Sequence, residues 1–348
     1  MDKSGSTFTE DLQSFEFPLA ELHAHLTAAI HPALYWKIAH NQGFKLPKQH
    51  YNDFYKHIAL SVEKKTTMKE YFDTVYHPLL NKLSSGTFAV EEAVYEILSG
   101  AYRVNNITVI ELRTNPMKHN FNGEVDLDNV IMAMLRGMER ALLEYSELSA
   151  GIIFCLDRQF TYKNNEIIVD KAIKYRKRGV VAIDFANYDT GKFKFKDYVK
   201  LVDKARDAGL KITTHTGETN DTNDMWDAIN YANPLRIGHG IKAAYDKALM
   251  KEISKRGIVL EVCPISNIST TAVKDVEELK FILRTFINNN VKFCINSDWP
   301  AIIKEAHLRR QLQFLRDQNI LSDEEIAQCT KISFESTFIP GKGLAAYL

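Results

Sequence analysis

Several features that mark specialised classes of protein are scarce or absent in this chain of 348 residues. It has only four cysteines and no CxxC pair, so neither a disulfide framework nor a cysteine-rich zinc motif is indicated. Lysine and arginine together number 44, as do aspartate and glutamate, so no bulk charge favours nucleic acid or a membrane surface as a partner. No apolar run is long enough for a membrane-spanning helix. The composition therefore fits a globular protein with a large core.

The start of the chain also lacks the strongly basic start and the apolar middle of a secretory signal peptide. Residues 1–16 are polar with several acids, and we expect them to form a flexible or loosely docked leader. Three of the cysteines, Cys155, Cys263 and Cys294, lie inside apolar runs, where a buried small hydrophobe is the expected role. The sequence therefore predicts a reduced, cytoplasmic protein.

Strand-like and helix-like segments alternate from about residue 105 onward, which is typical of a parallel sheet. Three of the expected helices end at a glycine just before the next strand, at Gly179, Gly209 and Gly257. Eight strands with intervening helices predict an (α/β)8 TIM barrel. A doubly wound open sheet is the alternative, but no Gly-rich dinucleotide loop is present. The predicted strands span residues 17–25, 108–113, 151–157, 180–185, 211–215, 235–239, 258–263 and 292–297.

A long helical insertion follows the first predicted strand, over residues 32–104, with Pro32 at a plausible helix start. Insertions at the active-site end of a barrel usually form lids or pocket walls, and a plain helical layer over the barrel is the alternative. No repeat or linker is visible, so we expect a single domain over residues 1–348 with a loose tail after residue 340. The other predicted helices span residues 127–145, 166–178, 196–208, 225–231, 245–256, 276–288 and 321–338.

Histidines and a carboxylate stand at the ends of three predicted strands. The first strand ends in Glu-Leu-His-Ala-His, and because strand side chains alternate faces, His23 and His25 point the same way. His215 and Asp298 end two later strands, and the carboxyl ends of barrel strands carry the active site. Imidazole nitrogen and carboxylate oxygen are zinc ligands. The sequence predicts one Zn²⁺ per chain on these four residues; buried histidines satisfied within the core are the alternative.

Two further groups stand beside the predicted metal. Glu218 follows His215 by three residues, beyond Gly217, and a carboxyl held off a metal is suited to carry a proton. His239 ends the sixth predicted strand and can steer a water or stabilise charge. A solvated loop acid is the alternative for Glu218, and a fifth ligand or a structural hydrogen bond is the alternative for His239.

These motifs together resemble the adenosine deaminase family of metal-dependent amidohydrolases. The resemblance implies a zinc barrel that removes ammonia hydrolytically from a purine-like base. It implies that Glu218 protonates the ring nitrogen beside the attacked carbon, and that His239 and Asp298 orient and activate the water. The matching stretches, in the family's order, are residues 21–26, 215–218, 236–240, 260–267 and 296–298, with weaker matches at 111–116 and 181–184.

The substrate-reading positions depart from the family's pattern. Thr27 stands where the family usually has an acid or amide for a ribose hydroxyl, and Asn187 stands where adenosine-using members have a glycine. Trp299 replaces a second aspartate that bonds the imidazole edge of the purine, and its indole nitrogen can only donate. Aromatic residues of the insertion at helical spacing, Tyr71, Phe72 and Tyr76, are candidates to line the pocket, with packing against the barrel as the alternative. The predicted substrate-binding residues are His25, Thr27, Asn187, Trp299, Tyr71 and Phe72.

Three functions fit these observations. The first is an aminohydrolase acting on adenosine or a related amino-purine, including N6-substituted nucleotides. The second is a barrel deaminase of a different amino-heterocycle, and the third is a non-catalytic relative that binds a nucleoside. Glu218 and His239 argue against the third, because a binding module needs neither. The expected partner is a small-molecule substrate, and the sequence gives no indication of oligomeric state.

Overall fold

The computed structural model describes residues 17–120, 126–188, 191–219 and 221–341. The predicted leader at residues 1–16 and nearly all of the predicted tail lie outside these ranges. Within them, no helix is long and apolar enough to cross a membrane. All four cysteines are free and buried, including Cys155, Cys263 and Cys294, for which the sequence predicted it.

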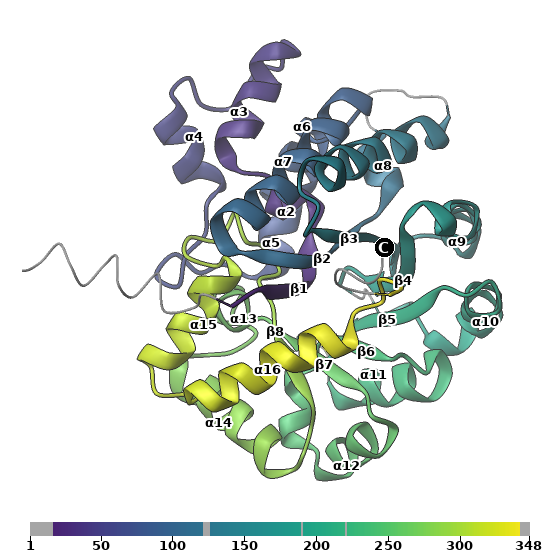
Figure 1. Cartoon of the computed structure of the whole chain (residues 1–348), viewed down its shortest axis with the longest axis vertical. Coiled ribbons are helices and arrows are strands. Elements are labelled where there is room, and N and C mark those ends of the chain that lie inside the picture. The colour runs from purple at the N-terminus through teal and green to yellow at the C-terminus, as the bar shows by residue number, and fades with distance from the viewer. Residues whose placement is uncertain (1–16, 121–125, 189–190, 220, 342–348) are drawn as a thin grey trace, which may run out of the picture.

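Eight parallel strands form one sheet in the order β1 to β8, which confirms the predicted barrel (Figure 1). Each strand pairs with the next one along the chain, and every observed strand overlaps its predicted range. The last two strands are shorter than expected. The strands are β1 Leu19–His25, β2 Ile107–Thr114, β3 Ser149–Asp157, β4 Val180–Ala186, β5 Lys211–Thr216, β6 Arg236–His239, β7 Val259–Val262 and β8 Phe293–Ile295.

The barrel closes at a short seam between β1 and the end of β8. A single parallel bridge joins Ala24 to Asp298, and the Asp298 N–H donates to the carbonyl of His23 at 2.8 Å. Below it, the buried Glu21 carboxylate accepts from the N–H groups of His23 at 3.0 Å and Ser297 at 3.1 Å. The seam therefore fixes the end of β1 directly beside the end of β8, which places the first histidine pair next to Asp298.

Helices surround the sheet, and α16 lies across β1 and β8 (Figure 1). Gly209 follows α10 and Gly257 follows α12, and both have positive φ, as expected where a helix ends. Gly179, which links the short 3₁₀ turn after α9 to β4, also has positive φ. Ser322 starts α16 with a complete capping box. The helices of this ring are α8 Leu127–Glu144, α9 Tyr162–Tyr175, α10 Val199–Asp207, α11 Thr222–Asp227, α12 Lys247–Arg256, α14 Val276–Asn288, α15 Leu308–Asp317 and α16 Asp323–Ser336.

The residues between β1 and β2 are helical, as predicted. Helices α3 and α4 project from the barrel (Figure 1), whereas α7 packs against β2 and α8 and takes the place of a ring helix. A nine-residue π-helix, η1, interrupts the insertion, and such segments are frequent at functional sites. These elements are α2 Leu26–Ala29, α3 Pro32–Asn41, α4 Tyr51–Ile58, α5 Met68–Tyr71, η1 Phe72–Leu80, α6 Asn81–Leu83 and α7 Thr87–Asn105.

A buried ionic network lies inside the barrel. Arg113 donates to Asp184 at 2.9 Å and to Glu261 at 2.6 Å, and both partners are fully buried. Arg236 donates to the second oxygen of Glu261 at 2.6 Å and to Glu111 at 2.5 Å. Buried charges need such partners, because an unpaired ion in the core is strongly destabilising. The network fixes two carboxylates, those of Asp184 and Glu261, directly beneath the histidines.

Candidate active site

The ends of β1 and β5 and the residues after β8 bring the four predicted ligands together. The Nε2 atoms of His25 and His215 lie 3.0 Å apart. Asp298 Oδ1 lies 3.4 Å from His25 Nε2 and 3.5 Å from His23 Nε2. Ligand atoms of His23, His25 and His215, and likewise of His23, His239 and Asp298, fall within 4.8 Å of one another. The four side chains therefore form one cluster at the carboxyl end of the barrel.

Two carboxylates orient the imidazoles of this cluster. His23 Nδ1 lies 2.8 Å from Glu261, and His215 Nδ1 lies 2.9 Å from Asp184. A proton on each Nδ1 leaves the lone pair of Nε2 facing inward, which is the arrangement of a metal-binding histidine. Burial holds the pKa of His23 and of His25 well below the ordinary value, so both rings are neutral near pH 7.

Unpartnered polar atoms point to a cation in this cluster. Among the described residues, His23 Nε2 and Asp298 Oδ1 are both buried without a hydrogen-bond partner. His23 and His215, whose Nδ1 atoms face carboxylates, present Nε2 lone pairs beside the Asp298 carboxylate, and these groups have no proton to donate to one another. A divalent metal satisfies them together, and three nitrogens with one oxygen are a donor set that zinc accepts. The residues present thus fit the predicted ion.

Glu218 and His239 face each other beside the cluster. Glu218 Oε2 lies 3.4 Å from His239 Nε2, and both side chains are buried. Burial first, and then the charge of Asp298, raises the pKa of Glu218 well above its ordinary value. Asn267 Nδ2 lies 2.9 Å from His239 Nδ1; with the amide as donor, the ring proton sits on Nε2. Glu218 and His239 can therefore present a protonated acid and an imidazole N–H donor side by side, next to the four predicted ligands.

The backbone adopts unusual conformations where these side chains leave their strands. His239 and Asp298 have φ of 61° and 62°, and Asn187, just after β4, has φ of 75°. Such values are uncommon for residues with a Cβ and cluster at functional sites. Gly217 also has positive φ, and a Cβ there would lie 2.3 Å from Met225 Sδ, so the turn that carries Glu218 requires glycine.

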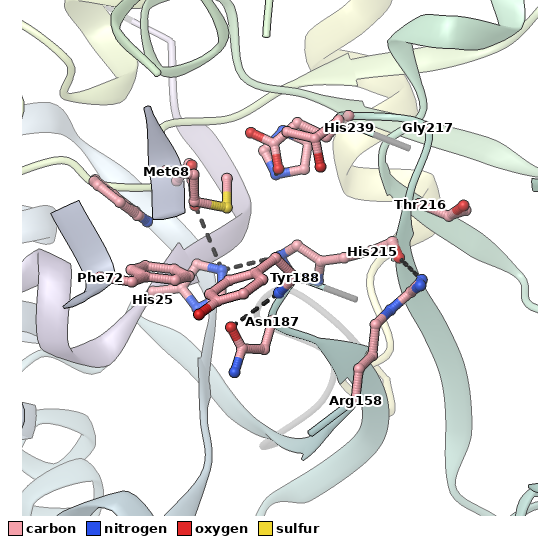
Figure 2. Close-up of a pocket in the computed structure, with 14 residues that line it drawn as sticks. His25, Met68, Phe72, Arg158, Asn187, Tyr188, His215, Thr216, Gly217 and His239 are labelled. Atoms are coloured by element: carbon pink, nitrogen blue, oxygen red, sulfur yellow. Dashed lines mark hydrogen bonds and ion pairs between the residues drawn. The ribbon is translucent and has the colours of Figure 1, made fainter. Parts of the chain in front are cut away.

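A pocket opens above the cluster. Figure 2 shows His25, Phe72 and Tyr188 gathered on one side of it, and His239 with Gly217 on the other. Its aromatic side comes from the insertion and from the segment after β4, so elements far apart in the chain share one wall. The lining residues are His25, Met68, Phe72, Arg158, Asn187, Tyr188, His215, Thr216, Gly217, Glu218, Thr219, His239, Asp298 and Trp299.

Most of the predicted substrate-binding residues lie at this pocket. Besides His25, these are Phe72, Asn187 and Trp299. Thr27 instead lines an adjoining chamber, where its hydroxyl donates to Asn81 at 3.2 Å.

The structure does not bring Tyr71 to the pocket. Its ring lies against Trp299 with centroids 5.2 Å apart, and its hydroxyl donates to the carbonyl of Ile58 at 2.6 Å. Tyr71 therefore supports the wall from behind, because its polar end is already satisfied inside the insertion. Met68 and Tyr188 line the pocket in addition to the predicted aromatics.

Trp299 is the centre of an aromatic cluster. Its ring lies 5.6 Å from those of Tyr76 and Phe72, and the plane of Tyr76 is tilted by only 28°. The side chain is 2% exposed yet still lines the pocket. The position after Asp298 thus presents a packed aromatic face to the site where an acid would present oxygen.

Sequence reasoning assigned no role to the carboxylates and amide that hold the site. Asp184, Glu261 and Asn267 lie within the motifs quoted above, but only the structure shows which histidine each one contacts. The available signal was an acidic residue inside an apolar strand, since buried acids require partners. Ser266 also contributes, because its hydroxyl donates to Asp298 Oδ2 at 2.6 Å.

Comparison with known proteins agrees with this fold. The family model described as adenosine deaminase matches residues 18–347. An adenosine deaminase of Shewanella halifaxensis is 26% identical over 323 residues, covering 93% of this chain and 95% of that protein. An amidohydrolase from Burkholderia ambifaria with bound zinc has a TM-score of 0.83 at 18% identity, covering 100% of this chain and 92% of that one. The N6-mAMP deaminase of Arabidopsis has a TM-score of 0.77 at 21% identity, covering 94% and 95%. Because the family model spans almost the whole chain, the protein belongs to the adenosine deaminase family.

Proposed function

We propose that this protein is a zinc-dependent hydrolytic deaminase that releases ammonia from adenosine or a related amino-purine nucleoside or nucleotide. The observation that carries the proposal is the buried acid Glu218 beside His239, next to four side chains whose chemistry and spacing suit a metal ion. A binding protein has no need of this pair, whereas a deaminase needs a proton donor and a positioned water. The proposed partner is a small molecule, and the proposed location is the cytoplasm, in keeping with four free, buried cysteines.

The proposed ligands of one zinc ion are His23, His25, His215 and Asp298. Zinc held there supplies the Lewis acidity that makes water a nucleophile near neutral pH. The zinc bound by the Burkholderia ambifaria amidohydrolase supports the choice of metal.

The protein's own groups carry the protons. Glu218, kept protonated by burial and by Asp298, donates to the ring nitrogen beside the amine-bearing carbon and so makes that carbon electrophilic. His239 orients the attacking water through its Nε2 side, held in place by Asn267. Addition of the water makes that carbon tetrahedral; one of the water's protons restores Glu218 and the other passes to the amine, which leaves as ammonia as the C–N bond breaks. His25, Phe72, Asn187 and Trp299 are the proposed substrate contacts.

Trp299 favours a second candidate, a deaminase of some other amino-heterocycle. An indole offers a face for stacking and one N–H donor, but no acceptor for a protonated ring edge. Bases stack on aromatic side chains without regard to their hydrogen-bonding pattern. The same proton chemistry would then act on a ring recognised chiefly by its face.

Ammonia release from a panel of amino-purines, amino-pyrimidines and amino-pterins tests the proposal. We expect turnover of at least one amino-purine, with the oxo product and ammonia formed in equal amounts. Turnover confined to amino-pyrimidines or amino-pterins would support the second candidate instead. A protein that binds these compounds but releases no ammonia from any of them is not a deaminase.

A further inference from the structure

A cavity lies between the sheet and its helices, behind the seam that joins β1 to the end of β8. It has a volume of about 540 Å³ and is lined by residues of β1, β2, α3, α7 and α15, whose places Figure 1 shows. Among the described residues, it shares no lining side chain with the candidate active-site pocket. Ligand pockets commonly have about 300–1,000 Å³, so this cavity has room for a small organic molecule.

Aliphatic side chains form most of the cavity wall. They include Leu34 of α3, Ile97 of α7, Ile107 and Ile110 of β2, and Leu308 of α15. The described lining residues include no Phe, Tyr or Trp, so a flat base would find no aromatic ring on which to stack. The wall therefore favours a saturated hydrocarbon, which is held by removal of its surface from water.

Gly100 keeps part of this space open. Ile97, Gly100, Ala101 and Val104 fall at helical spacing on one face of α7, and all four line the cavity. Glycine inside a helix is less favourable than alanine, yet a Cβ at Gly100 would meet no atom within 4 Å. Gly137 of α8 differs, because a Cβ there would strike a carbonyl of α7. Close packing therefore does not require Gly100, whereas a ligand in the cavity would use the space that it leaves.

The polar groups of the cavity favour a hydrogen-bond donor at the buried end of the ligand. Asn105 is 7% exposed, and its Oδ1, which can only accept, has no partner among the described residues. Glu21 also lines the cavity, and its carboxylate already accepts from the N–H groups of His23 and Ser297. An anionic group at this end would meet the Glu21 carboxylate, whereas a neutral hydroxyl would donate to Asn105.

We propose that this cavity binds a neutral aliphatic alcohol, with its hydroxyl donating to Asn105 and its hydrocarbon body lying along α7. The inference is independent of the proposed deaminase function, because the cavity and the candidate active-site pocket have separate walls. A carboxylate could be held at the exposed mouth by Lys37. That orientation would leave Asn105 unpaired, and an exposed charge contributes little.

Calorimetric titration of the full chain with hexanol, octanol and octanoate tests the choice of ligand. We expect octanol to bind about tenfold more tightly than hexanol, because two further methylene groups are buried. We expect octanoate to bind about tenfold or more weakly than octanol, since it has no proton for Asn105. Absence of octanol binding, or equal affinity for octanoate, would overturn the inference.

The variant Gly100→Leu tests the place of binding by filling the cavity from α7. We expect its octanol affinity to fall by about tenfold or more, while its thermal stability is kept or rises, because leucine favours the helix more than glycine does. Lys251→Leu is the matched control, since it adds a leucine at an exposed position of α12. Wild-type octanol affinity in Gly100→Leu, or displacement of octanol by a purine analogue, would contradict the proposed place.

The variant Asn105→Leu tests the hydrogen bond. We expect the preference for octanol over octanoate to disappear, because neither compound then finds an amide oxygen at its buried end. Thermal unfolding checks that the variant is folded. An unchanged preference in the folded variant would reject the role of Asn105. None of these binding measurements requires ammonia release, so their failure and the failure of the proposed deaminase function are distinguishable.

Discussion

The carboxylate of Glu218 and the imidazole of His239 lie 3.4 Å apart. Both side chains are buried, and the two residues lie at the ends of different strands. Glu218 comes from the turn after β5, and His239 ends β6 in a left-handed backbone conformation. Their contact gives the site a proton donor with a raised pKa next to a ring that is itself held by Asn267. The proposed deamination requires this pair to act beside a metal.

Glu218→Gln keeps the shape of the side chain but removes its titratable proton. We expect turnover to fall by on the order of a hundredfold or more, the usual contribution of a general acid, with metal content unchanged. Because burial and Asp298 raise the pKa of Glu218, the wild-type rate should fall as pH rises through that raised value. The variant should lose this limb of the pH profile. Glu252→Gln on α12 is the matched surface control. Loss of the metal from the Glu218 variant would make Glu218 a ligand instead.

Asp184→Asn replaces the carboxylate that holds His215 by its Nδ1. We expect zinc affinity to fall by about 10–100-fold, the typical effect of removing such an outer partner. Competition with a chelator measures this, and thermal unfolding of the zinc-loaded protein checks that Arg113 tolerates the change. Asp203→Asn, beside Arg206 on the exterior, is the control. Wild-type zinc affinity in a folded Asp184→Asn protein would refute the orienting role.

Trp299 should make the protein a poor deaminase of plain adenosine relative to its best substrate. Losing one hydrogen bond in a site built around it costs about 1–3 kcal/mol, or roughly a factor of ten to a hundred. Trp299→Asp should raise kcat/KM for adenosine, whereas Trp299→Phe, which keeps an aromatic face, should not. Wild-type kcat/KM for adenosine of roughly 10⁶ M⁻¹s⁻¹ or above, the range of good enzymes, would show that another group reads the base.

The insertion should close over a bound ring. Met68 and Phe72 already line the pocket, and the Tyr188 hydroxyl donates to Asp73 at 3.2 Å across its edge. Hydrogen exchange with and without a bound purine analogue should therefore show increased protection across residues 55–80. If hydrogen-exchange protection over that range does not change, the insertion is a fixed wall of the pocket and does not close over the ligand.

The sequence predicted the barrel and the grouping of His23, His25, His215 and Asp298 because both depend on local patterns. Alternating strand and helix periodicity indicates the topology of the sheet. The position of His23 or His215 at a strand end indicates that its side chain lies at the carboxyl end of the barrel. The contacts of the site were not predictable in the same way. Tyr71 and Phe72 are adjacent in the helical insertion, but their surroundings differ. Packing in three dimensions places Tyr71 behind Trp299 and Phe72 at the pocket.

Long-range ion pairs also could not be predicted from the sequence. Lys118 follows β2 and Asp157 ends β3, and nothing in the sequence near either residue indicates that they meet. Asp184 and Glu261 read as acids inside apolar strands, which signals a buried partner but not its identity. Such pairings depend on strand register around the whole barrel, which one chain's pattern does not specify.

Ammonia release measured on the same preparation before and after removal of its metal tests the central claim most directly. We expect about one zinc per chain for a mononuclear site, loss of ammonia release from an amino-purine nucleoside when the metal is removed, and recovery on adding zinc. Full hydrolytic activity in rigorously metal-free protein would contradict the account.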